Sequence, residues 1–163
     1  MQKNPLSHRM AHKTIQLVDP SGNPVAGKEI AIHQTNHKFL FGCGIFDVIQ
    51  VANRNVPENR LAYLEQKLDL FLDVFNFATL PFYWGMFEPE KGKPRTKELQ
   101  AAARWLKERN IAVKGHPLCW HTATVPWLLD LSNEDILKAQ FARIERDVTD
   151  FKGLIEMWDV INE

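Results

Sequence analysis

The sequence predicts an α/β fold with a parallel sheet. Strand-like and helix-like segments alternate in the order β-α-β-α-β-α-β over residues 39–163. The strand-like segments are short, continuous apolar runs, which are typical of strands buried on both faces. The 163 residues suffice for one domain at roughly 100–200 residues per domain. They are too few for a complete α/β barrel, which needs about 250 residues.

The composition excludes several classes of protein. Hydrophobic residues make up 45% and charged residues 25%, which are globular proportions. Lys+Arg and Asp+Glu both number 20, whereas nucleic-acid binders usually have a basic surplus, so we expect no nucleic-acid partner. No run approaches the roughly 20 apolar residues of a membrane span, so we expect no membrane partner. The first twenty residues lack the apolar centre of a signal peptide, which leaves either a cytoplasmic protein or a start upstream of Met1.

Residues 1–12 are expected to be a disordered lead, and residues 13–38 an N-terminal β-hairpin segment. Ile15 and Leu17 alternate with polar neighbours, as do Ile30 and Ile32. The stretch between them contains two Pro and two Gly, which indicates a turn. Because an isolated hairpin is marginally stable in water, we expect this one to pack on something.

From residue 39 the strands and helices follow in order. Residues 39–46 are the first apolar run, and residues 59–75 form an amphipathic helix with apolar residues three or four apart, namely Leu61, Leu64, Leu68, Phe71 and Phe75. A second strand is predicted over 75–84, a helix over 96–110 and a third strand over 111–121. Ser132 and Asp135 fit a capping box that opens a third helix, whose apolar spacing predicts a core stripe of Leu137, Phe141, Ile144 and Val148. Residues 154–163 are the fourth strand.

Polar and aromatic residues gather where the predicted strands end. Ligands of parallel sheets bind at the carboxyl ends of the strands. The residues found there are Tyr83, Trp84, His116, Cys119, Trp120, His121, Trp158, Asp159, Asn162 and Glu163. This distribution favours a binding cleft. A carboxylate such as Glu163 at a strand end is either a general acid with a raised pKa or a salt-bridge partner, and spacing alone does not separate the two.

A metal site at His116, Cys119 and His121 is disfavoured. Strand alternation puts Cys119 and His121 on one face and His116 on the other, and a tetrahedral site needs further ligands. We therefore expect no metal and no cofactor. His121 is either a hydrogen-bond partner at the sheet rim or a core histidine bonded to backbone. Cys119 and Cys43 lie in apolar runs and are expected to be buried free thiols.

Four of the five tryptophans lie in strand ends or the loops that follow them: Trp84, Trp120, Trp127 and Trp158. Each alone is most simply a core residue. Together they favour a sugar site, because sugar rings have apolar faces that stack on indoles.

These residues resemble glycoside hydrolase family 10, the endo-β-1,4-xylanases. WDVINE (158–163) is similar to the motif around that family's acid/base glutamate, and KGHPLCWH (114–121) to its third-strand motif. FEPEKG (87–92) resembles its loop after the second strand, and FLFG (39–42) its first strand. The matches occur in the family's order over about residues 39–163. The resemblance implies that this stretch is the first half of a (β/α)8 TIM barrel, truncated after the fourth strand.

The resemblance also implies a retaining hydrolysis of β-1,4-bonds in xylan or a related plant polysaccharide. Two carboxylates about 5–5.5 Å apart carry out such a reaction. Glu163 matches the acid/base, Asn162 the residue that holds the 2-hydroxyl of the cleaved sugar, and His121 a histidine that contacts the same sugar. Trp120 is implied to line the floor of the site.

Two departures from the family pattern matter. The family's nucleophile lies on the seventh strand and this chain provides four, so we expect the 163 residues alone to be inactive. The loop at 79–84 lacks the family's Glu-Asn and Lys, whose sugar contacts Tyr83 and Trp84 are expected to replace. A non-catalytic carbohydrate-binding or scaffold protein, or a different barrel glycosidase, remains the alternative. Four parallel strands have two open edges, so we also expect self-association through them.

Overall fold

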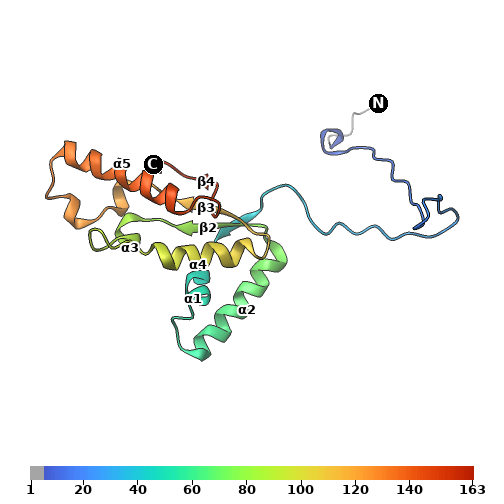
Figure 1. Ribbon diagram of the computed structural model, residues 1–163, viewed down its shortest axis with the longest axis horizontal. Coiled ribbons are helices and arrows are strands. Elements are labelled where there is room, and N and C mark those ends of the chain that lie inside the picture. Colours follow the sequence, from blue (N-terminus) through green and yellow to red (C-terminus); the bar gives the residue numbers. More distant parts are fainter. Residues whose placement is uncertain (1–5) are drawn as a thin grey trace. The chain divides into compact units, whose positions relative to one another are not determined.

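The computed structural model describes residues 6–163, so the predicted lead at 1–12 lies partly outside the described residues. The chain divides into two compact units, Met1–His37 and Lys38–Glu163. The second unit contains the sheet and the α-helices (Figure 1). None of the described helices is long and apolar enough to cross a bilayer.

In the segment 13–38, where the sequence predicts a hairpin, the structure shows a turn closed by a single antiparallel bridge. The Asp19 carboxylate accepts hydrogen bonds from the backbone N–H groups of Ser21 and Asn23, and Val18 pairs with Pro24 in one antiparallel bridge. The described part of this unit has no further strand pairing. Its predicted apolar residues are exposed, with Ile32 at 78%, so the ribbon buries too little apolar surface to extend.

The second unit confirms the predicted α/β fold with a parallel sheet, as in the first half of a barrel. Strands β1 (Gly42–Gly44), β2 (Phe77–Pro81), β3 (Ala112–His116) and β4 (Met157–Trp158) lie side by side in chain order, and all pairs are parallel. Each strand is shorter than the apolar run that predicts it, because the runs continue into the loops at either end.

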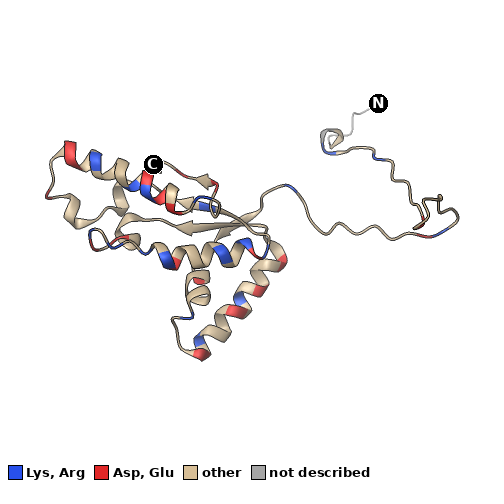
Figure 2. Cartoon of the chain, viewed as in Figure 1, with Lys and Arg blue, Asp and Glu red and all other residues tan. Residues whose placement is uncertain are grey.

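Five α-helices accompany the strands: α1 (Asp47–Asn53), α2 (Glu58–Val74), α3 (Trp84–Phe87), α4 (Thr96–Lys107) and α5 (Asn133–Asp150). Helices α2, α4 and α5 match the predicted ones, and Ser132 caps α5 by accepting the Asp135 N–H at 3.2 Å. Helices α1 and α3 are too short to produce a periodic pattern, and the sequence does not predict them. Figure 2 shows acidic and basic residues interspersed along α2, α4 and α5.

The helices cover one face of the sheet, so the expectation of strands buried on both faces is wrong for this chain. Ala78, Leu80 and Val113 share one face and are buried against residues of α1, α2 and α4. Lys114 and His116 alternate with them and are half-buried on the opposite face. Side chains on the two faces differ because successive residues of a strand point to opposite sides.

Helix α5 buries a different face from the one predicted. Of the predicted core stripe, Leu137 is 56% exposed and Phe141 64%, and Val148 is exposed as well. The buried residues are instead charged: Arg143 and Asp147 are 3% and 0% exposed. The apolar spacing shows which residues share a face, but packing in this chain turns the neighbouring polar face inward.

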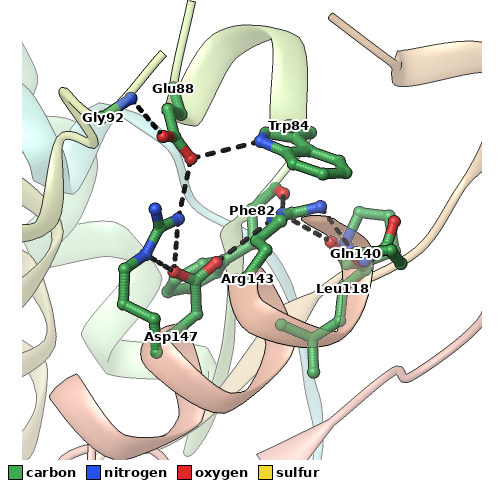
Figure 3. A network of polar contacts seen from close by, with 10 residues as sticks. Phe82, Trp84, Glu88, Gly92, Leu118, Gln140, Arg143 and Asp147 are labelled. Carbon is green, nitrogen blue, oxygen red and sulfur yellow. Dashed lines mark hydrogen bonds and ion pairs between the residues drawn. The ribbon is translucent and has the colours of Figure 1, made fainter. Parts of the chain in front are cut away.

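A buried network of charges ties α5 to the loop after β2 (Figure 3). Arg143 Nε donates to Asp147 at 3.2 Å, and Arg146 forms ion pairs of 2.8 Å with both Asp147 and Glu88. Glu88, which belongs to the FEPEKG segment, also accepts the Trp84 indole N–H at 3.2 Å and the Gly92 N–H at 2.7 Å. Each buried charge is therefore paired, as the cost of desolvation requires.

Replacing Gly115 is expected to disrupt the packing between β3 and β4. A Cβ at this position would lie 2.2 Å from the Trp158 ring, so the indole must move. We expect Gly115→Ala to lower the free energy of unfolding by about 1–3 kcal/mol in urea titrations. Gly44→Ala on β1 is the control, because its Cβ would meet only the exposed Phe46 ring at 3.2 Å. Equal losses in the two variants would contradict this account.

Glu88 is expected to contribute to the loss of stability in acid. Burial raises the pKa of Glu88, but Arg146 and two N–H donors outweigh it and hold the pKa below the ordinary 4.5. A carboxylate whose pKa is lowered by folding stabilises the protein above its ordinary pKa, and this contribution disappears as the pH falls through the folded-state pKa. Burial raises the pKa of Asp147, which therefore contributes with the opposite sign.

We expect Glu88→Gln to cost about 1–3 kcal/mol at neutral pH and to flatten the fall of the unfolding free energy below about pH 4.5. The measurement is a series of urea unfolding curves from neutral to acid pH. Glu90→Gln is the matched control, since Glu90 is exposed and forms its ion pair with the exposed Lys93. An unchanged acid slope in Glu88→Gln would contradict the assignment.

Candidate functional site

The carboxyl ends of β2, β3 and β4 meet at one edge of the sheet, as predicted. Pro81 pairs with His116, and beyond β3 the Leu118 N–H donates to the Asp159 carbonyl at 2.9 Å. Farther along, Cys119 bridges Ile161, and the Asn162 N–H donates to the Cys119 carbonyl at 2.9 Å. The pairing therefore continues past the strands proper. It brings the loop residues that follow β2 and β3 next to the segment 159–163.

A cluster of three ionisable side chains lies on the open face at this edge. The Asp159 carboxylate is 2.7 Å from Lys114 Nζ and 2.7 Å from His116 Nδ1. Burial raises the pKa of Asp159, but Lys114 and His116 outweigh it and hold the pKa below its ordinary value. Because an ionised carboxylate only accepts hydrogen bonds, His116 Nδ1 carries the proton. In the neutral ring, Nε2 is then an acceptor for a hydroxyl group.

Sequence reasoning considered His116 only as a metal ligand and missed its link to Asp159. The signal was the spacing: His116 lies two residues after Lys114, on the same face of β3. The partner Asp159 could not be found without the register between β3 and β4.

Tyr83 and Trp120 form an aromatic pair beside this cluster. The Tyr83 ring lies 5.7 Å from the Trp120 ring and 5.6 Å from the His116 ring, centroid to centroid. Both aromatic side chains are half-buried. An aromatic surface next to hydrogen-bonding groups can bind a sugar, whose faces are apolar and whose edges are polar.

Trp84 lies in a packed cluster, although the sequence suggests a sugar contact. It is 5% exposed, packs with Val125 and Leu128, and meets Trp127 edge to face at 5.5 Å. Its indole N–H is bonded to Glu88. The indole therefore supports the loop after β2 from inside and has no open face for a ligand.

His121 lies outside the strand, because β3 ends at His116 and the following Pro117 has no N–H to continue the ladder. His121 instead begins the short 3-10 helix η2 (His121–Ala123) and is exposed. The predicted alternation of His116, Cys119 and His121 along one strand is thus wrong.

The remaining predicted residues lie near the end of the described chain. Asn162 is half-buried beside Cys119, and Glu163 is exposed.

Cys43 is exposed and Cys119 half-buried, so the expectation of two buried thiols is wrong. Within residues 6–163 no group of three His, Cys, Asp or Glu side chains is placed to hold a metal ion.

Solved structures share this fold. Xylanase 10B from Thermotoga petrophila RKU-1, crystallised with xylobiose, superposes with a TM-score of 0.61 at 23% identity, over 75% of this chain and 36% of that one. A GH10 endoxylanase from a sugarcane soil metagenome gives a TM-score of 0.63 at 18% identity, over 77% of this chain and 37% of that one. At this identity the likeness shows the fold: a partial α/β barrel.

Curated relatives include endo-1,4-beta-xylanase 5 of Arabidopsis thaliana, which is 28% identical over 85% of this chain. The anti-sigma-I factor RsgI6 of Acetivibrio thermocellus is 26% identical over 95% of it. The chain spans only 23% and 19% of the lengths of these two proteins. Residues 50–163, well over half of the chain, match the sequence profile of glycosyl hydrolase family 10. The chain is therefore a member of glycosyl hydrolase family 10, with the first part of that family's barrel.

Proposed function

We propose that this chain forms the acid/base half of the substrate site of a retaining β-1,4-xylan hydrolase. The observation that carries the proposal is the edge where Tyr83 and Trp120 lie beside the hydrogen-bonded pair His116–Asp159. Asn162 and Glu163 follow Asp159 along the same segment. Family membership supplies the reaction class.

Each residue takes a distinct task in this proposal. Glu163 protonates the leaving glycosidic oxygen and, after the first displacement, deprotonates the attacking water. Asn162 holds the 2-hydroxyl of the cleaved sugar. Tyr83 and Trp120 stack on the sugar ring, and His116 accepts a hydrogen bond from a hydroxyl through Nε2.

His121 is proposed to contact the same sugar from the exposed rim. Trp84, which the structure buries, supports the loop that presents Tyr83. The second carboxylate of a retaining site comes from the family's seventh strand, which these 163 residues do not include. We therefore propose that the chain alone binds the polysaccharide without cleaving it.

A binding or sensing protein is the second candidate function. The match that extends over 95% of this chain belongs to a protein named as an anti-sigma-I factor. The loop at 79–84 also carries Tyr83 and Trp84 where the family pattern has polar sugar contacts. In a binding or sensing protein, the same edge of the sheet would bind the polysaccharide. No second carboxylate would join Glu163 to form an active site.

We expect the chain to bind xylohexaose in calorimetric titrations and to release no phenol from an aryl xyloside. Trp120→Ala is expected to weaken xylohexaose binding about tenfold, because it removes the ring that stacks on the sugar. Trp105→Ala is the matched control, since Trp105 lies on α4 under the Arg109 side chain.

Three outcomes would contradict this proposal. Absence of xylohexaose binding, or equal weakening by Trp120→Ala and Trp105→Ala, would remove the assignment of the sugar site. Turnover of the aryl xyloside that disappears in Glu163→Ala would show that the chain already contains a complete active site. A longer chain that includes these residues and hydrolyses xylan favours the enzyme over the sensing protein.

We also propose that the chain self-associates through the two edges of its sheet. Beside β1, the exposed apolar residues are Phe39, Leu40, Phe41, Phe46, Leu70 and Val74. Beside β4 and along α5, they are Leu137, Phe141, Val148, Val160 and Ile161. Unpaired strand edges next to exposed apolar side chains favour association with another chain.

Sedimentation velocity is expected to show species heavier than the 18.9 kDa monomer. The double variant Phe141→Lys/Ile161→Lys should shift the distribution toward monomer, because it places charges on one of the two edges. Ile15→Lys in the N-terminal unit is the control for added charge, since Ile15 is 68% exposed there. A monodisperse wild-type monomer would contradict the proposal.

A further inference from the structure

On the buried face of α5, the side chain of Arg143 extends toward the ends of β2 and β3. Arg143 is 3% exposed, yet an apolar residue would fill the same space at a lower desolvation cost. Its guanidinium donates to the Phe82 carbonyl at the end of β2, and at 2.6 Å to the Leu118 carbonyl beyond β3 (Figure 3). Gln140, one turn earlier, donates to the same Leu118 carbonyl at 2.9 Å.

The orientation of the Arg143 guanidinium is fixed at Nε, on the edge opposite the two nitrogens that bind the carbonyls. Its Nε is bound by Asp147, which is itself paired with Arg146 and through it with Glu88 of the FEPEKG segment. The guanidinium also lies over the Trp84 indole, 4.8 Å from the ring centroid. Because a guanidinium is planar and rigid, fixing one edge of it fixes the donors on the other.

The two carbonyls that Arg143 binds precede the aromatic residues of the site. Phe82 is the neighbour of Tyr83, and Leu118 lies two residues before Trp120. The Trp120 indole N–H is buried and makes no hydrogen bond within residues 6–163. Within the described residues, no hydrogen bond from the indole N–H therefore fixes this ring, which lies 5.7 Å from the Tyr83 ring.

We propose that Arg143 is a positioning residue: by binding the Phe82 and Leu118 carbonyls together, it sets the separation and orientation of Tyr83 and Trp120. The consequence for sugar binding rests on the proposed function, whereas the effect on the aromatic pair does not. In this arrangement the FEPEKG segment has a structural role, because Glu88 holds Arg146, Arg146 holds Asp147, and Asp147 orients Arg143.

The test uses the 163-residue chain labelled with 5-fluorotryptophan, and it compares Arg143→Met with two controls. Arg109→Met also removes an arginine from an indole face, that of Trp105 on α4, whose ring centroid lies 3.8 Å from the guanidinium. Leu106→Ala opens the core under α4 and serves as a variant of lowered stability, since Leu106 is fully buried. The Trp120 resonance is assigned from the spectrum of Trp120→Phe.

The expected result has two parts, both measured where each variant is fully folded. Arg143→Met shifts or broadens the Trp120 fluorine resonance, whereas Arg109→Met and Leu106→Ala leave it unchanged. Arg143→Met also weakens xylohexaose binding about tenfold or more, because small displacements in a binding site are costly. Arg143→Lys restores neither readout, since an ammonium group cannot reproduce the fork.

An unchanged Trp120 resonance in Arg143→Met, or an equal change in Leu106→Ala, would overturn the positioning role. If the wild-type chain does not bind xylohexaose but the Trp120 resonance still responds to Arg143→Met alone, the proposed sugar site fails and the positioning role stands. The two proposals are thereby tested separately.

Discussion

The parallel pairing of β2, β3 and β4 is the constraint on which the candidate site depends. Because the three strands run in the same direction, their carboxyl ends meet at one edge, and each candidate side chain follows one of these ends. The register also decides the face: His116 and Asp159 can bond only because both point to the open side. A slip of one residue between β3 and β4 would send one of them to the opposite face.

The helices cover only one face of the sheet. This one-sided cover explains both the polar cluster on the open face and the exposed apolar residues at the edges. The covered face is apolar and fully buried, as Ala78 and Leu80 show. The open face accepts Lys114, His116 and Asp159 because these three groups pair with one another and remain partly solvated. Where the helices and strands have no neighbour, residues such as Phe141 and Ile161 stay exposed. The polar cluster and the exposed apolar residues at the sheet edges therefore have the same structural origin.

The sequence was sufficient to predict the order of strands and helices and the edge at which polar groups gather. Apolar spacing correctly identified the buried side of α2, with Leu61, Leu64 and Leu68 in the core. It failed for α5, because periodicity shows which residues share a face but not which face meets a partner. The sequence also placed His121 wrongly in a strand. The apolar run at 111–121 continues past His116, where β3 ends, so the run does not mark the end of the strand. The pairing of His116 with Asp159 depends on long-range register, which no local pattern contains.

The polar interior of α5 shows how packing and site geometry are connected. Stability alone does not explain Arg143, because buried ion pairs are often no better than apolar residues of similar volume. The carbonyls at the ends of β2 and beyond β3, however, need donors once the strand ladder no longer supplies them. An arginine on the covering helix satisfies both carbonyls at once and thereby couples two loops that are more than thirty residues apart in sequence. The buried Arg143 of α5 is thus bonded to the two loops that carry Tyr83 and Trp120, which is the basis for its proposed effect on their spacing.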